Sequence, residues 1–125
     1  VHAAMALIDV MKGSGIPVHT VGLGLIASSG LLIFMSGEKG HRTLTPNTSV
    51  LSHQYSWGGS GKAHELFARQ KEFEMADDRI LNLYKKATGL KEKVIRDKLL
   101  PPHDIWLSAT EAKKYKLCDH VREMK

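Results

Sequence analysis

The chain has 125 residues, of which 42% are hydrophobic and 25% are charged, and its formal net charge is +5. This length supports one hydrophobic core, and the composition argues against disorder, a collagen-like repeat and a disulfide scaffold. The lysines are dispersed among acidic residues and aromatic residues make up only 6%, so we expect a solvated basic surface and no nucleic-acid partner.

The first half of the chain predicts short elements. Apolar residues recur at positions 1, 4, 5, 8 and 11 with helical spacing, and glycines at 13 and 15 end this helix. β-Branched residues predict a strand over 18–21, and a short buried helix is expected over 28–35. A turn over 40–42 then leads to two extended segments, 43–45 and 49–53.

The second half contains the strongest pattern, a helix over 62–87 whose apolar residues lie seven apart and whose length would be roughly 40 Å. The preceding Gly-rich residues 57–61 are expected to be flexible or extended. After a C-cap at Gly89 we expect a helix near 90–99, a strand at 105–107, a helix opened by the Ser108–Glu111 capping box, and a strand over 118–121.

Alternation of strands and helices predicts an α/β fold. The strands are few and short for a complete two-layer fold, so we expect part of the sheet to be missing. The chain begins with Val1 rather than Met, which fits a processed chain or a fragment.

A candidate nucleophile, Ser28, stands in the segment Gly-Leu-Ile-Ala-Ser-Ser-Gly at 24–30, where a strand meets a helix. A helix start offers free backbone N–H groups and the positive end of the helix dipole, so the Ser29 amide is a candidate oxyanion donor. The alternative is that Ser28 caps the helix among small residues that pack tightly.

Three other motifs fail. Residues 22–27 match a dinucleotide-binding loop, but no second strand ends in an acidic residue about 20 positions later. Ile26 stands where the Gly-x-Ser-x-Gly elbow needs glycine. His64 begins a zinc-protease motif that Ala68 breaks, and no Cys/His cluster has zinc spacing, so no metal is expected.

A candidate general base, His53, ends a buried-looking strand, which is a rigid place facing a cleft. A carboxylate would orient it, and Asp104, which opens a strand after two prolines, is one candidate. Spacing alone leaves the choice open among further aspartates: Asp77, Asp78, Asp97 and Asp119. A structural histidine and a turn aspartate are the plain alternatives.

Together these segments resemble the proteolytic subunit family of the caseinolytic protease, ClpP, over essentially the whole chain. Residues 24–30 are similar to the family's Gly-x-Ala-Ala-Ser-Met-Gly, and 51–55 to its strand ending in His-Gln-Pro. Residues 104–112 resemble Asp-Arg-Phe-Leu-Ser-Ala-x-Glu-Ala, and 115–119 resemble Tyr-Gly-Leu-Val-Asp. The step of 25 residues from Ser28 to His53 also matches.

The resemblance implies a serine endopeptidase with the repeated β-β-α spiral of the ClpP/crotonase superfamily. It assigns the nucleophile to Ser28, the base to His53, the orienting carboxylate to Asp104 and an oxyanion amide to Ser29. Residues 1–125 would be one protease domain, the C-terminal two-thirds of a subunit that lacks its first strands.

The resemblance also implies a handle between two heptameric rings, formed by a Gly-rich strand and a long helix over 54–88. Four residues would line a groove in which substrate adds as a β-strand: Tyr55, Trp57, Gly58 and Gly59. Implied partners are further copies of the chain in rings that can stack, an AAA+ unfoldase such as ClpX or ClpA/ClpC, and unfolded polypeptides. ATP is used by that unfoldase, and no cofactor is expected in this chain.

The chain departs from the family pattern at three positions. Ser29 stands where the family has Met, Tyr55 replaces Pro, and His103 replaces a charged residue that helps the rings sense each other. Val1 falls just after the Gly-Gly pair that supplies the second oxyanion amide, so the early strands, the pore loops and much of the ATPase docking surface are expected before it.

The expected location is the cytoplasm of a bacterium or of a phage-infected host, with an organelle also open. Apolar runs such as 31–35 are too short to span a membrane, the N-terminus lacks a signal peptide's pattern, and the lone Cys118 fits a reducing compartment. Two alternatives stay open: a catalytically silent ClpP-like assembly subunit, and a crotonase-type acyl-CoA enzyme, since that superfamily shares the fold.

Overall fold

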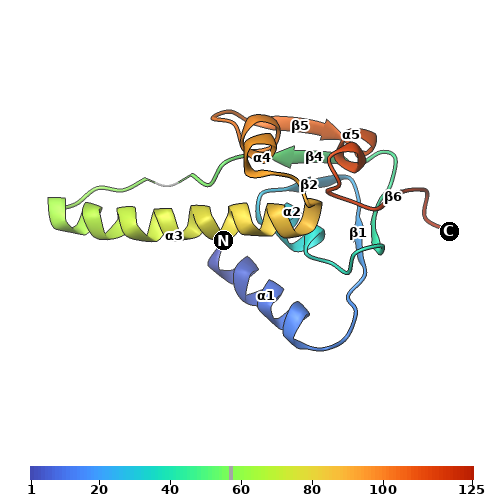
Figure 1. Cartoon of the computed structure of the whole chain (residues 1–125), viewed down its shortest axis with the longest axis horizontal. Coiled ribbons are helices and arrows are strands. Elements are labelled where there is room, and N and C mark those ends of the chain that lie inside the picture. The colour runs from blue at the N-terminus through green and yellow to red at the C-terminus, as the bar shows by residue number, and fades with distance from the viewer. Residues whose placement is uncertain (57) are drawn as a thin grey trace.

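The computed structural model describes residues 1–56 and 58–125, and its helices and strands alternate along the chain (Figure 1). The helices are α1 (His2–Gly13), α2 (Ser29–Met35), α3 (Ala63–Thr88), α4 (Glu92–Lys98) and α5 (Ala109–Lys114). The strands are β1 (Thr20–Gly22), β2 (Leu25–Ala27), β3 (Arg42–Leu44), β4 (Ser49–Ser52), β5 (Ile105–Ser108) and β6 (His120–Val121).

The strands form two three-stranded sheets. One has the order β1-β3-β6 with all strands parallel, and the other has the order β2-β4-β5 with β2 and β4 parallel and β5 antiparallel to β4. In the two units β1-β2-α2 and β3-β4-α3, the consecutive strands enter different sheets before the helix follows. This is an α/β fold with β-β-α units, as the family resemblance implies.

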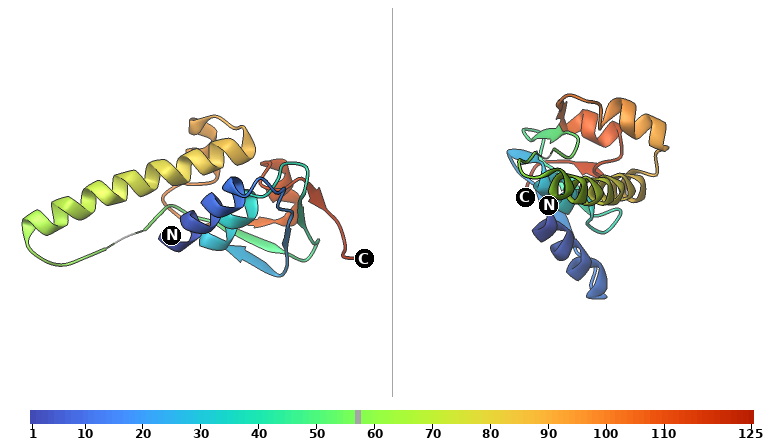
Figure 2. Two further views of the ribbon diagram at one scale, coloured as in Figure 1. Left: turned by 90° about the horizontal axis from the view of Figure 1, so that it is seen from below. Right: turned by 90° about the vertical axis from the view of Figure 1, so that its left-hand side faces the viewer.

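Helix α3 belongs to the core only over its C-terminal half, and its N-terminal half projects away from the sheets (Figures 1 and 2). Its buried apolar residues begin at Ala76, whereas Phe67 is 75% exposed. Gly89 ends the helix with a φ of 71°, a left-handed conformation that favours glycine, which confirms the predicted C-cap.

The Gly-rich segment before α3 differs from its prediction as a strand. Residues 54–56 and 58–62 belong to no strand of the described structure. A strand needs a neighbour to receive its hydrogen bonds, and the contact recorded here is with α3 instead: the Tyr55 ring stacks on Phe73 with centroids 5.6 Å apart. The described residues of this segment therefore form no strand within the single chain.

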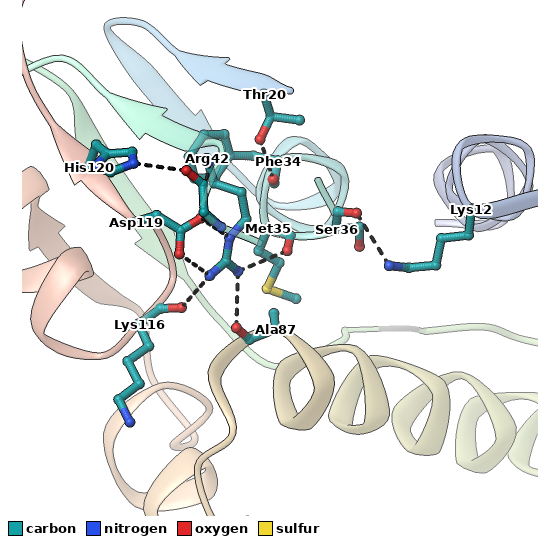
Figure 3. A network of polar contacts seen from close by, with 11 residues as sticks. Lys12, Thr20, Phe34, Met35, Ser36, Arg42, Ala87, Lys116, Asp119 and His120 are labelled. Atoms are coloured by element: carbon teal, nitrogen blue, oxygen red, sulfur yellow. Dashed lines mark hydrogen bonds and ion pairs between the residues drawn. The ribbon is translucent and has the colours of Figure 1, made fainter. Parts of the chain in front are cut away.

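A buried arginine, Arg42, links four segments that are distant in the sequence (Figure 3). Arg42 is 2% exposed, and its Nε and Nη2 donate to the two carboxylate oxygens of Asp119, each at 2.9 Å. The remaining N–H groups donate to the carbonyls of Met35, Ala87 and Lys116 at 3.0–3.3 Å. All five donors are satisfied, so β3, α2, α3 and the segment after α5 meet at one charge.

Two predicted boundaries move, and one capping motif is confirmed. Arg42 lies in β3 rather than in a turn, and the first strand begins at Thr20 rather than Val18. The Ser108 hydroxyl accepts the Glu111 backbone N–H, while the Glu111 carboxylate accepts that of Ser108, each at 3.1 Å. Within the described ranges, no helix combines the length and the apolar character needed to cross a bilayer.

Candidate active site

The second sheet brings the three predicted catalytic positions to one edge. β2 and β4 are parallel with Ala27 opposite Leu51, so Ser28 and His53 follow the carboxyl ends of neighbouring strands. β5 runs antiparallel to β4 and begins at Ile105, opposite Ser52. Asp104, the residue before β5, therefore stands opposite His53 if the register is continued by one position.

Ser28 occupies a strained junction between β2 and α2. Its φ of 54° and ψ of −128° lie in a region that side chains rarely adopt, at a cost of about 1–3 kcal/mol. The hydroxyl makes no capping hydrogen bond, and among the described contacts it makes no other. Ser28 is the N-cap residue of α2 by position, but its exposed hydroxyl does not cap the helix and is left available there.

A pocket beside this serine is shared by most of the predicted site. Ser28, Ser29, His53 and Tyr55 line it. The rest of the lining is almost entirely apolar and comes from the chain start, α2, β4 and α3: Val1, Leu32, Leu51, Ile80 and Tyr84. Its volume of about 30 Å³ leaves room for little more than a water-sized group next to the hydroxyl.

The Ser29 amide is placed as an oxyanion donor would be. Ser29 is the first residue of α2, so its N–H has no carbonyl one turn earlier to receive it. The Ser28 carbonyl accepts from Leu31 and Leu32, at 3.1 and 3.4 Å, and these later amides are thereby occupied. The first amide of the turn remains for a developing negative charge beside Ser28.

The imidazole of His53 is half-buried and held in one tautomer. Its Nδ1 lies 2.7 Å from the Gln54 carbonyl oxygen. A carbonyl can only accept, so Nδ1 carries the proton and the neutral ring has its lone pair at Nε2. This is the tautomer that a general base acting through Nε2 requires.

The structure does not join Asp104 to His53 by a hydrogen bond. Asp104 is exposed, and its carboxylate has no hydrogen bond or ion pair among the described contacts. The position that a triad carboxylate would fill at Nδ1 is held by the Gln54 carbonyl. The strand register brings Asp104 to the same edge as His53, without a hydrogen bond between the two among the described contacts.

The predicted groove residues lie along the side of α3. Tyr55 lines the pocket of Ser28 and also a second hollow, which it shares with Gly58, Arg69 and Phe73. Gly59 lies so close to Arg69 that a Cβ there would collide with the guanidinium. Trp57 lies outside the described residues.

Sequence reasoning missed the polar supports of the base strand. The Ser52 hydroxyl contacts the Tyr84 hydroxyl at 2.7 Å and the Leu99 carbonyl. The Gln54 amide donates to the Leu100 carbonyl at 2.9 Å. Tyr84 was visible only as one more member of an apolar helical stripe, and no local signal links it to a residue 32 positions earlier.

No metal centre accompanies these residues in the part of the chain that the structure describes. Within residues 1–56 and 58–125, no group of three or more His, Cys, Asp or Glu side chains is arranged to hold an ion. The chemistry available at this edge is that of a hydroxyl, an imidazole and a backbone amide.

Comparison with known proteins identifies the family to which this chain is similar. The family model described as Clp protease matches residues 1–125. The chain is 36% identical over 97% of its length to the ATP-dependent Clp protease proteolytic subunit of Deinococcus radiodurans, covering 58% of that protein. It is 34% identical over 98% of its length to subunit 2 of Corynebacterium diphtheriae, covering 61%, and 35% identical over 97% to subunit 1 of Chlamydia muridarum, covering 63%.

The chain thus spans about three-fifths of the length of these curated relatives. The family model matches the chain from its first residue to its last. The chain belongs to the Clp protease family.

Proposed function

We propose that this chain is the catalytic part of a serine endopeptidase, in which Ser28 is the nucleophile and His53 the general base. One observation carries the proposal. An unpaired hydroxyl in a strained strand-to-helix junction shares a pocket with an imidazole in the tautomer of a base. Membership of a family whose curated members are named as proteolytic subunits supports the same reaction.

The proposed reaction proceeds in two steps. Ser28 Oγ attacks the carbonyl carbon of a peptide bond while His53 Nε2 accepts its proton, and the imidazolium then gives that proton to the leaving amine. Water, deprotonated by Nε2, attacks the resulting ester, releases the acid and restores Ser28. The Ser29 amide stabilises the oxyanion in both steps.

Asp104 has a separate part in the proposal. A rotation of the His53 side chain would exchange the Gln54 carbonyl for the Asp104 carboxylate at Nδ1, since both lie at the same strand end. A carboxylate stabilises the imidazolium better than a carbonyl does. We therefore expect Asp104→Asn to lower kcat on a peptide substrate by 10-fold or more, while Asp78→Asn, an exposed aspartate on α3, leaves it unchanged.

The finer features are proposed from the family. The relatives are named as ATP-dependent, which fits an AAA+ unfoldase that consumes ATP and delivers unfolded polypeptide to rings of this subunit in the cytoplasm. No cofactor within this chain is required by the proposed steps.

A fluorophosphonate probe tests the nucleophile on the complete protein. Labelling is expected in the wild type, is expected to vanish in Ser28→Ala, and is expected to persist in Ser14→Ala, which removes an exposed hydroxyl after α1. Labelling that survives Ser28→Ala would overturn the assignment of Ser28.

A second candidate, a catalytically silent assembly subunit, is favoured by one observation: the described contacts include no hydrogen bond between His53 and Asp104. Activity assays on rings made of this subunit alone distinguish the silent subunit from the peptidase. Hydrolysis of a fluorogenic peptide by such rings excludes silence, whereas rings that neither hydrolyse nor label at Ser28 exclude the peptidase.

A further inference from the structure

Two buried hydroxyls contact each other next to the proposed base, at the end of β4. Ser52 is 1% exposed and Tyr84 is 2% exposed, and their oxygens lie 2.7 Å apart. The Ser52 hydroxyl also contacts the Leu99 carbonyl, which can only accept. Ser52 therefore donates its single proton to the Leu99 carbonyl, and the Tyr84 hydroxyl donates to Ser52. Both hydrogen bonds thus have a defined donor and acceptor.

These two hydrogen bonds can affect the placement of His53, because His53 lies just beyond the end of the sheet. The last pair between β4 and β5 is Ser52 with Ile105, so no further pair of the ladder holds the backbone of His53. Its backbone is placed by the residues on either side. Ser52 is tied to the Leu99 carbonyl, and Gln54 donates to the next carbonyl, Leu100, at 2.9 Å.

Both anchors belong to the end of α4. The Leu99 and Leu100 amides each donate to the Ile95 carbonyl, at 2.9 and 2.8 Å, which leaves their own carbonyls directed toward β4. The Gln54 carbonyl in turn accepts the His53 Nδ1 proton. The end of α4 thus connects through Gln54 to the tautomer of the imidazole, and through Ser52 to its backbone.

Stability alone does not require these hydroxyls. Burying a hydroxyl is unfavourable unless it is hydrogen-bonded, and replacing both partners by apolar groups is close to neutral. The pair instead restricts the position of the strand end. The hydrogen bond to the Leu99 carbonyl limits where Ser52, and hence the adjacent His53, can lie.

We propose that Ser52 and Tyr84 are positioning residues that hold the end of β4 against α4 and thereby aim His53 at Ser28. The proposal rests on the proposed function, since it assigns His53 the role of the base. A displacement of a catalytic group by about 1 Å can lower the rate about 100-fold, so loss of this anchor is expected to reduce kcat rather than binding.

The test compares Ser52→Ala with Ser36→Ala in the complete protein. Ser36 is a matched control, because its buried hydroxyl also donates to a carbonyl, that of Leu32 at 2.7 Å, but at the far end of α2. We expect both variants to lower the melting temperature, Ser52→Ala by more because it also leaves the buried Tyr84 hydroxyl without its acceptor. Ser52→Ala alone is expected to lower kcat on a fluorogenic peptide at least 10-fold, with KM changed less than twofold.

The double variant Ser52→Ala/Tyr84→Phe separates positioning from stability. Ser52→Ala leaves the Tyr84 hydroxyl buried without its acceptor, and removing that hydroxyl as well is expected to recover part of the melting temperature, since the Leu99 carbonyl still lacks its donor. The expected kcat stays at the low value of Ser52→Ala. If kcat recovers together with the melting temperature, or if Ser52→Ala behaves like Ser36→Ala, the proposal is overturned.

A readout that needs no activity distinguishes this failure from failure of the proposed function. Histidine-selective ¹⁵N NMR, with His53 assigned through His53→Gln, reports which ring nitrogen carries the proton. We expect an Nδ1–H tautomer in the wild type and in Ser36→Ala, and a mixture in Ser52→Ala. If the wild type neither hydrolyses peptide nor is labelled, but Ser52→Ala still alters the tautomer of His53, the peptidase is refuted and the positioning role stands. If the wild type is active and Ser52→Ala leaves the tautomer unchanged, the positioning role is refuted.

Discussion

The ion pair between Arg42 and Asp119 gives a quantitative prediction about stability and pH. The Asp119 side chain is 20% exposed, and the hydrogen bonds from the Arg42 guanidinium lower the pKa of its carboxyl to about 2 from an ordinary value of 3.8. At 1.36 kcal/mol per pH unit, this difference corresponds to roughly 2 kcal/mol of folding stability at neutral pH.

The sign follows from the direction of the pKa change. Because the folded protein holds the carboxylate more strongly than the unfolded chain does, the contribution is complete well above pH 3.8. It is lost as the pH falls from about 3.8 toward 2. Asp119→Asn imitates the protonated state, and it leaves the buried guanidinium of Arg42 without a counter-charge.

Urea unfolding followed by circular dichroism, at fixed protein concentration, measures the effect. We expect Asp119→Asn to lower the free energy of unfolding by about 2 kcal/mol at pH 7, and the deficit to shrink as the wild type is titrated toward pH 2. Asp78→Asn, which removes an exposed carboxylate with no partner among the described contacts, serves as the control. A deficit below about 0.5 kcal/mol at pH 7, typical of an exposed pair, or one independent of pH, would refute the reasoning.

Three further predictions concern packing and capping elsewhere in the fold. Burial raises the pKa of the Cys118 thiol to about 11, so its reaction with a disulfide reagent at pH 8 should be slow in native protein and rapid in urea; equal rates would contradict this burial. Gly37→Ala should lower stability by about 1–3 kcal/mol in thermal melts, because its new Cβ would lie 2.6 Å from the Thr20 hydroxyl, whereas Gly30→Ala meets no atom within 4 Å. Ser108→Ala should cost about 1 kcal/mol in urea unfolding by removing the cap of α5, and Thr110→Ala, which leaves the capping box intact, should cost less.

The sequence by itself determined the features that depend on neighbours along the chain. The helix expected over 62–87 is found as α3, Ala63–Thr88, because apolar spacing and the glycine after it define its limits. The Ser108 capping box and the junction at Ser28 follow from residues within one helical turn. Such signals act locally, so they can be read without knowing how the chain packs.

Only the tertiary structure decided the contacts between distant segments. Arg42, expected in a turn, enters β3 because carbonyls from α2, α3 and the segment after α5 surround its guanidinium. The Gly-rich segment forms no strand among the described residues, since a strand depends on a neighbour that this chain does not place there.

The candidate site shows the same division. The proposed nucleophile and base, Ser28 and His53, could be placed near each other from sequence because each follows a strand, and parallel strands bring their carboxyl ends together. The acceptor at His53 Nδ1 and the pairing of Ser52 with Tyr84 could not, because they depend on which groups lie within hydrogen-bond distance once α3 and α4 pack against β4. Hydrogen bonds are decided over about 3 Å, and that precision exists only in the folded chain.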